Sequence, residues 1–264
     1  MPNVNSRDGT RIAFSRDGSG PPILLVDGAL CYRGMGPAEP LAALLTPSFT
    51  VYTYDRRGRG ESGDTAPWSV EREVEDIAAV ISEADGSVNL YGISSGAALA
   101  LEAANTFPAM IRKLAVYEAP FIVDDSRDAI PDDYLSRLHT LLAENDRGAM
   151  LKMFMKFVGM PSVMLLVMPL FPAWKKLKQV AHTLVNDIAI VQRNQKGRPI
   201  RAEQWSAVTM PTLAADGGKS PTWMRNGVKA VAAALPNATY RTLDSQTHML
   251  NPKAIAPVLV QFFQ

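Results

Sequence analysis

One stretch decides the fold of this chain: Val88-Asn89-Leu90-Tyr91-Gly92-Ile93-Ser94-Ser95-Gly96-Ala97-Ala98. Its apolar beginning predicts a β-strand, and the small residues after Gly96 predict a helix, so Ser94 lies at the tip of a sharp turn. Glycine at 92 and 96 lets the strand and the helix approach closely around this strained turn. The free N–H groups of the helix N-terminus face the space above Ser94. A serine hydroxyl held there is placed to attack a carbonyl, beside donors for the oxyanion.

The composition limits the possible classes of protein. The chain has 264 residues, 47% of them hydrophobic and 20% charged, which is typical of one large globular domain or of one domain with an insertion. A net charge of +1 gives no electrostatic reason to expect a nucleic acid or an anionic membrane as a partner. The single cysteine, Cys31, excludes an internal disulfide framework and a cysteine-based zinc site. With no apolar signal segment at the start, we expect a cytoplasmic protein.

Strand and helix patterns alternate along most of the chain. Val70, Val74, Ile77 and Ile81 form the core stripe of an amphipathic helix that Ser69 begins. Continuous apolar strands that alternate with helices predict a mostly parallel sheet covered on both faces. The expected strands are residues 11–15, 23–26, 49–54, 88–93, 113–117, 210–215 and 239–243.

Residues 121–208 break this alternation, because they contain helical patterns and no convincing strand. We therefore expect an α/β core formed by residues 1–120 and 209–264, with residues 121–208 inserted as a helical cap. Ligands of open parallel sheets bind at the carboxyl ends of the strands. The cap begins at that edge, so it is positioned as a lid.

The chain resembles the α/β-hydrolase superfamily over essentially its whole length. The resemblance rests on Gly92-Ile93-Ser94-Ser95-Gly96, the turn Asp55-Arg56-Arg57-Gly58-Arg59-Gly60, the helical cap after the sixth strand and a histidine after the last strand. Gly-x-Ser-Ser-Gly-Ala followed by a strand that ends in Glu-x-Pro looks like the lactonase branch that includes zearalenone hydrolase. The resemblance implies an α/β-hydrolase fold, Ser94 as the nucleophile and no cofactor or metal.

The chain has three candidates for the general base that a serine nucleophile requires. His139 and His182 lie in the cap, whereas His248 directly follows the last strand. The order of the catalytic residues in the family is serine, acid, histidine, which implies that His248 is the base.

The acidic member of the triad has two main candidates. Most family members place it after the strand at 212–215, but there this chain has Ser220 in the expected position and Asp216 just before the turn. Glu118 ends the preceding strand, where the lactonase branch supplies its acid. We favour Glu118, while Asp216, Asp244, a water-mediated arrangement and the absence of an acid remain open.

The resemblance also implies an oxyanion hole formed by the backbone N–H groups of Ser95 and Ala29, with Gly28 adjacent. Asp27 is expected to point away from it. The arginines of the turn at 55–60 are expected to form a solvated turn with salt bridges. The cap is rich in methionine and aromatic residues, so we expect Met155, Phe157 and Trp174 to line an apolar substrate pocket.

Together these features predict a serine hydrolase that cleaves a small apolar ester or lactone through an acyl-enzyme, as a monomer or homodimer. Three alternatives stay open. The same triad performs C–C bond hydrolysis and perhydrolysis, the fold also carries non-catalytic ligand-binding proteins, and a lidded cavity suits a non-hydrolytic isomerase or cyclase.

Overall fold

The strands form one sheet with the order β1-β2-β4-β3-β5-β6-β7-β8. The computed structural model describes residues 2–264, apart from the side chain of Ala202. β2 pairs antiparallel with β1 and β4, and all other neighbouring strands are parallel. The strands are β1 (Asn3–Asn5), β2 (Arg11–Gly18), β3 (Pro22–Val26), β4 (Thr50–Tyr54), β5 (Val88–Ile93), β6 (Ile111–Tyr117), β7 (Thr212–Gly217) and β8 (Ala238–Leu243).

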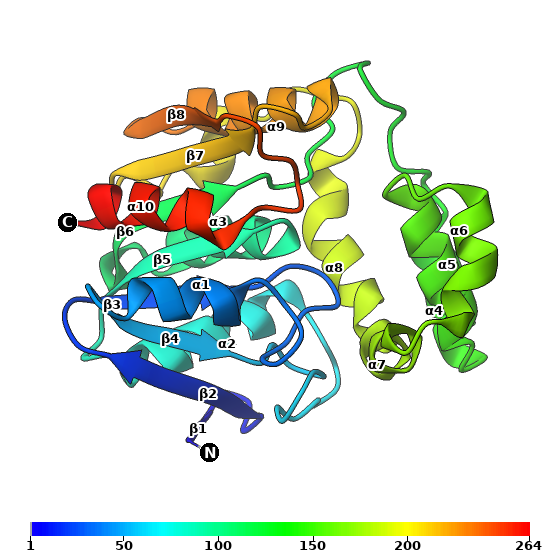
Figure 1. Cartoon of the computed structure of the whole chain (residues 1–264), viewed down its shortest axis with the longest axis horizontal. Coiled ribbons are helices and arrows are strands. Elements are labelled where there is room, and N and C mark those ends of the chain that lie inside the picture. Colours follow the sequence, from blue (N-terminus) through cyan, green and yellow to red (C-terminus); the bar gives the residue numbers. More distant parts are fainter. Residues whose placement is uncertain (1) are drawn as a thin grey trace.

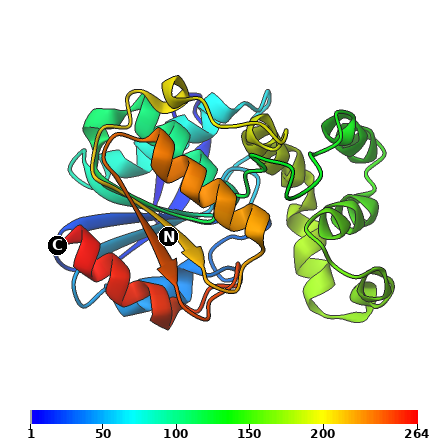
Figure 2. The same ribbon diagram turned by 90° about the horizontal axis from the view of Figure 1, so that it is seen from above.

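Helices cover both faces of the sheet (Figure 2). α1 (Ala38–Leu45) and α10 (Pro252–Phe263) pack on one face, in an apolar cluster that includes Leu25 and Tyr117. α2 (Val70–Ser82), α3 (Ser95–Thr106) and α9 (Thr222–Ala234) cover the other face. Every residue of β4 and β5 is buried, as the continuous apolar strands predicted.

The fold class predicted from the sequence is confirmed. The core stripe of α2 is largely buried, and the Ser69 hydroxyl caps this helix by accepting the backbone N–H of Arg72 at 3.3 Å. The sequence did not predict β1, because its three residues carry neither an apolar run nor a turn signal.

A block of helices lies between β6 and β7. It contains α4 (Tyr134–Ala143), α5 (Arg147–Phe157), α6 (Ser162–Val167), α7 (Ala173–Val180) and α8 (Leu184–Val191), and short 3-10 turns join α6 to α7 and α7 to α8. Their apolar side chains form a small separate core around Leu138, Met150, Leu151 and Leu184. We call residues 121–208 the cap.

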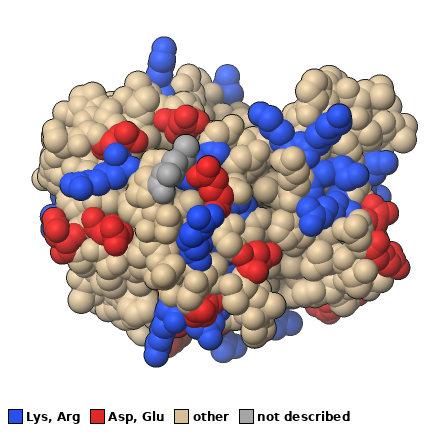
Figure 3. Space-filling view, turned by 90° about the horizontal axis from the view of Figure 1, so that it is seen from below, with Lys and Arg blue, Asp and Glu red and all other residues tan. Residues whose placement is uncertain are grey.

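The cap stands over the carboxyl ends of the parallel strands, with α8 nearest the sheet (Figure 1). Acidic and basic side chains are interspersed over the sheet portion of the face shown in Figure 3, which fits the net charge of +1. Within residues 2–264, no helix combines the length and the apolar character that crossing a membrane requires.

Candidate active site

Ser94 stands on a tight turn between β5 and α3. Its backbone has φ 59° and ψ −129°, a conformation that a residue with a side chain rarely adopts. A Cβ on Gly92 would lie 2.5 Å from the carbonyl oxygen of Gly96, and one on Gly96 would lie 2.4 Å from that of Val26. Only glycine fits at either position. The turn therefore raises Ser94 above the sheet while its neighbours stay buried.

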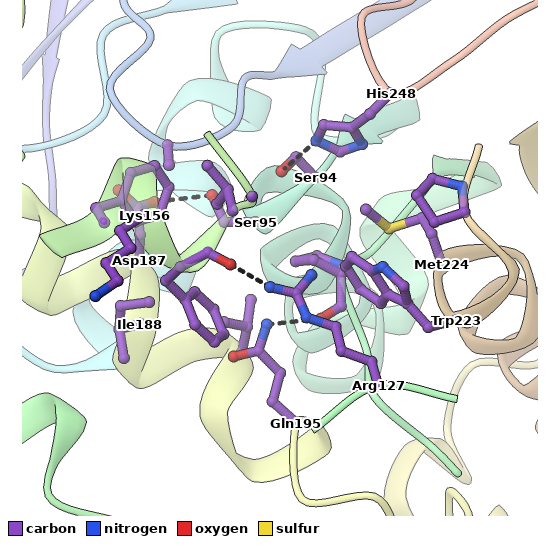
Figure 4. A pocket seen from close by; sticks show the side chains of 18 of the residues that line it. Ser94, Ser95, Arg127, Lys156, Asp187, Ile188, Gln195, Trp223, Met224 and His248 are labelled. Atoms are coloured by element: carbon purple, nitrogen blue, oxygen red, sulfur yellow. Dashed lines mark hydrogen bonds between the residues drawn. The ribbon is translucent and has the colours of Figure 1, made fainter. Parts of the chain in front are cut away.

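Three side chains that are far apart in the sequence meet at this turn. The Nε2 atom of His248 lies 3.2 Å from the Ser94 hydroxyl oxygen, and its Nδ1 atom lies 2.9 Å from Oε2 of Glu118 (Figure 4 shows the first contact). These distances allow a proton to pass from serine to imidazole while the carboxylate holds the other ring nitrogen.

The carboxylate of Glu118 is fixed from several sides. It is fully buried, and its Oε1 atom accepts the backbone N–H of Gly217 at 2.7 Å. The backbone of Glu118 has φ 47°, and its N–H donates to the Ala215 carbonyl at 3.1 Å. The residue is thus held on β7 through both its backbone and its side chain, and the second carboxylate oxygen is left for His248.

Asp216, the alternative acid, faces other partners. It is also fully buried, but its Oδ2 atom accepts the Tyr240 hydroxyl at 2.6 Å and the Nε–H of Arg225 at 3.3 Å. Asp216 belongs to β7 itself, so its side chain lies on the same face as that of Ala214, toward α9. The structure therefore brings Glu118, and not Asp216, to His248. Of the other histidines, His139 is exposed on α4 and His182 lies 3.6 Å from Asp64.

The loop that follows β3 passes directly beside Ser94. A Cβ on Gly28 would lie 2.9 Å from the Cβ of Ser94. The Gly28 carbonyl accepts a hydrogen bond from Arg59 at 2.8 Å, which turns this oxygen toward the arginine. Ala29 and Ser95 both line the cavity above Ser94, and Ser95 is the first residue of α3. The predicted oxyanion-hole residues thus surround the serine.

Asp27 points away from the serine, toward the start of α1. Its carboxylate is buried against Gly36 and accepts the backbone N–H of Ala38. Burial raises the pKa of Asp27 to about 7, although Arg59 and the bond from Ala38 act in the opposite direction.

The arginine turn is not solvated, which corrects the expectation from the sequence. Arg56, Arg57 and Arg59 are each no more than 1% exposed. Each pairs with a buried or nearly buried carboxylate, because a fixed charge inside a protein requires a partner. The shortest contacts are Arg56–Glu73 at 2.6 Å, Arg57–Asp76 at 2.6 Å and Arg59–Asp187 at 2.7 Å.

Asp187 of α8 was not predicted as a site residue, although it contacts the turn that carries Ser94. Its carboxylate accepts the Ser95 hydroxyl at 2.8 Å and pairs with Arg56 at 2.8 Å as well as with Arg59. Burial raises the pKa of Asp187, but Arg59 and Arg56 outweigh it and hold this pKa below its ordinary value. The one sequence signal is a charge inside the apolar run Leu184-Val185-Asn186-Asp187-Ile188.

Two cavities meet at Ser94 and His248. One has a volume of about 610 Å³ and includes Phe157, the other has about 570 Å³ and includes Met155 and Cys31. Both share Ala29, Phe154 and Val158. Trp174, which the sequence analysis placed in the pocket, lines neither of them. It lies in the first turn of α7 and packs in the apolar cluster of the cap, where its ring approaches Gly148 of α5.

The described residues 2–264 hold no group of three or more histidine, cysteine, aspartate or glutamate side chains that could bind a metal ion. The arrangement at Ser94 instead combines a hydroxyl, an imidazole and a carboxylate in one line.

Comparisons with known proteins identify the family of the chain. Residues 18–258 match the sequence profile of the alpha/beta hydrolase family. A crystal structure of an alpha/beta hydrolase from Sphaerobacter thermophilus is 48% identical, with a TM-score of 0.90 and full coverage of both chains. The enol-lactonase from Burkholderia xenovorans is 20% identical, with a TM-score of 0.69 and 99% of each chain covered. A hydrolase from Pseudomonas aeruginosa is also 20% identical, with a TM-score of 0.74, and the match covers 99% of this chain and 97% of the other. The chain therefore belongs to the alpha/beta hydrolase family.

Proposed function

We propose that this protein is a serine hydrolase that cleaves a carboxylic ester or lactone through an acyl-enzyme intermediate. The observation that carries the proposal is the continuous contact from Ser94 through His248 to Glu118 at the meeting point of two cavities. Membership of the family supports hydrolysis in general. The choice of an ester or lactone rests on the serine at the turn and on the apolar lining of one cavity.

The first half of the reaction forms the acyl-enzyme. The Ser94 hydroxyl oxygen attacks the carbonyl carbon, and Nε2 of His248 takes the hydroxyl proton. The Glu118 carboxylate holds Nδ1–H and stabilises the imidazolium. The oxyanion receives hydrogen bonds from the backbone N–H groups of Ser95 and Ala29. Nε2 then returns the proton to the alcohol oxygen as the C–O bond breaks.

The second half releases the acid. Water attacks the acyl carbon and gives a proton to Nε2 of His248, and the same N–H donors stabilise the second oxyanion. The bond to the Ser94 oxygen breaks as His248 returns the proton to that oxygen. A lactone follows the same steps, except that its alcohol stays attached to the acyl group until water releases the hydroxy acid.

The cavity of about 570 Å³, called the apolar cavity below, indicates the chemical character of one arm of the substrate. Its side chains come from the core loops as well as from the cap, and most of them carry no charge. Methionine side chains adapt to apolar groups of varied shape. The apolar members of the lining include Leu30, Met35, Pro40, Ile93, Met155, Leu177 and Leu250.

The test is Ser94→Ala, assayed with p-nitrophenyl butyrate and with an aryl lactone. We expect kcat/KM to fall by at least ~10³-fold, to the rate that binding and the oxyanion hole alone provide. Ser126→Ala is the matched control, because this serine lines the same cavity but bonds Asp124. Wild-type turnover by Ser94→Ala would refute the proposal.

A further inference from the structure

Cationic side chains line part of the larger cavity, the one of about 610 Å³. In addition to Ser94 and His248 it is lined by Arg127, Lys156 and Gln195. Within residues 2–264, neither Arg127 nor Lys156 forms a salt bridge with a carboxylate. Asp187 also lines the cavity, but Arg56 and Arg59 neutralise it from the core side. The free charge on this cavity wall is therefore positive.

Arg127 is held in a fixed orientation. The central carbon of its guanidinium lies 4.2 Å from the ring centroid of Trp223 and 4.9 Å from that of Phe157. One Nη atom donates a hydrogen bond to the Phe157 carbonyl. Figure 4 shows the guanidinium pointing back toward the middle of the cavity. Stacking on aromatic rings fixes the plane of the guanidinium, so its remaining N–H groups present a rigid edge to a ligand.

The environment of Arg127 favours an anion. Burial lowers the pKa of Arg127, and the nearby charge of Asp128 only partly opposes this. A partly desolvated cation with no carboxylate in contact is stabilised by a ligand that supplies a carboxylate. Charge-assisted hydrogen bonds of this kind are among the strongest hydrogen bonds in proteins.

Gln195 supplies a second, independent sign of a polar ligand. This residue is 2% exposed, and its Nε2 donates to the Pro120 carbonyl at 2.7 Å. Its Oε1 atom is buried and has no hydrogen-bond partner among the described residues. Buried acceptors in native proteins are nearly always satisfied, so a ligand that enters this cavity has a vacant acceptor to fill.

We propose that Arg127 and Gln195 form a subsite for a carboxylate-bearing arm of the substrate. This inference rests on the proposed function and narrows it. The substrate is an ester or lactone with an acidic group on one side of the scissile bond, bound by the Arg127 guanidinium. Its other arm occupies the apolar cavity that contains Met155. A hydroxyl or amide N–H beside the carboxylate satisfies Gln195.

The experiment compares acids with their own methyl esters, on either side of the scissile bond. One pair is p-nitrophenyl hydrogen glutarate and its methyl ester, and the other is 4-carboxyphenyl butyrate and its methyl ester. The enzymes are the wild type, Arg127→Gln and Arg127→Lys. Arg137→Gln is the control, because it removes the same charge from an exposed arginine of α4 that lies outside the cavity. A thermal melt of each variant reports folding.

We expect the wild type to prefer the acid in at least one pair by about tenfold or more in kcat/KM. Arg127→Gln should bring that ratio close to one, whereas Arg127→Lys should keep part of it and Arg137→Gln all of it. A wild type without preference in both pairs, or a preference that survives in Arg127→Gln, would overturn the subsite.

A direct binding measurement separates this inference from the proposed function. Calorimetry with glutarate should give a Kd at least about tenfold weaker for Arg127→Gln than for the wild type. If no ester is turned over but this difference is present, the proposed function is wrong and the anion subsite stands. Equal binding of glutarate by both proteins refutes the subsite, whatever the esters show.

Discussion

Glu118 and Asp216 occupy the ends of neighbouring strands, and both carboxylates are fully buried. Glu118 follows β6 in a backbone conformation with φ 47°, and its two oxygens contact Gly217 and His248. Asp216 belongs to β7, so the alternation of the strand directs it toward Tyr240 and α9. A buried carboxylate at the carboxyl edge of the sheet is therefore not enough for catalysis. What decides its role is the group that it faces.

The largest expected effect separates these two carboxylates. Glu118→Gln keeps the shape of the side chain but cannot stabilise a positive His248, so turnover of an ester should fall by roughly 10²–10⁴ with the fold intact. Asp216→Asn is the matched control and should cost less than about tenfold, because Asp216 does not contact the histidine. Turnover beside a thermal melt of each variant makes the comparison. An inactive Asp216→Asn together with an active Glu118→Gln would reverse the assignment.

Asp187 extends the comparison to the cap, because it faces two arginines instead of a histidine. Removing the Asp187 charge from this buried cluster leaves Arg59 without a carboxylate partner and Arg56 with Glu73 alone, at a cost of about 3–5 kcal/mol. For a chain of this size, we expect the melting temperature of Asp187→Asn to fall by about 10 °C. The control is Asp133→Asn, an exposed residue whose pair with Arg137 contributes little. Equal melting temperatures for wild type and Asp187→Asn would show that the network does not anchor the cap.

Asp27 is expected to give the smallest effect. Its pKa of about 7 in the folded protein lies above its ordinary value of 3.8, so the folded state retains the proton longer than the unfolded state. The contribution of Asp27 to stability is therefore favourable below about pH 4 and is lost as the pH rises to about 7. Asp27→Asn removes this dependence.

Melting curves at several pH values test the Asp27 prediction. The melting temperature of Asp27→Asn relative to the wild type should rise between pH 5 and pH 8, by about 5 °C or more. Asp17→Asn serves as the control because Asp17 is exposed. A difference between Asp27→Asn and wild type that does not change with pH would contradict the raised pKa.

Sequence reasoning located the sheet and the serine turn because both depend on local patterns. Continuous apolar strands, and glycines at positions where a Cβ has no room, are visible in a few consecutive residues. The position of Glu118 after β6 was also readable. The assignment of the lactonase branch remains a prediction, since the similar structures establish the wider family only.

What the sequence did not reveal depends on distant contacts. The pairs of Asp187 with Arg56 and Arg59 join residues 131 and 128 positions apart, so no local pattern shows that the arginine turn is buried. The same limit applies to Trp174, because a large aromatic side chain in the cap suits a substrate pocket as well as it suits the cap core. The position of Arg127 between Phe157 and Trp223 also depends on how the cap sits on the sheet.

The rate at which a fluorophosphonate labels Ser94 tests the central claim most directly, because phosphonylation requires an activated serine hydroxyl and no particular substrate. The adduct is mapped by mass spectrometry in wild type, Glu118→Gln and Asp216→Asn. The account predicts labelling of Ser94 in all three proteins, with Asp216→Asn within about tenfold of the wild-type rate and Glu118→Gln slower by about 10² or more. Labelling of another serine, or an Asp216→Asn protein that reacts more slowly than Glu118→Gln, would contradict it.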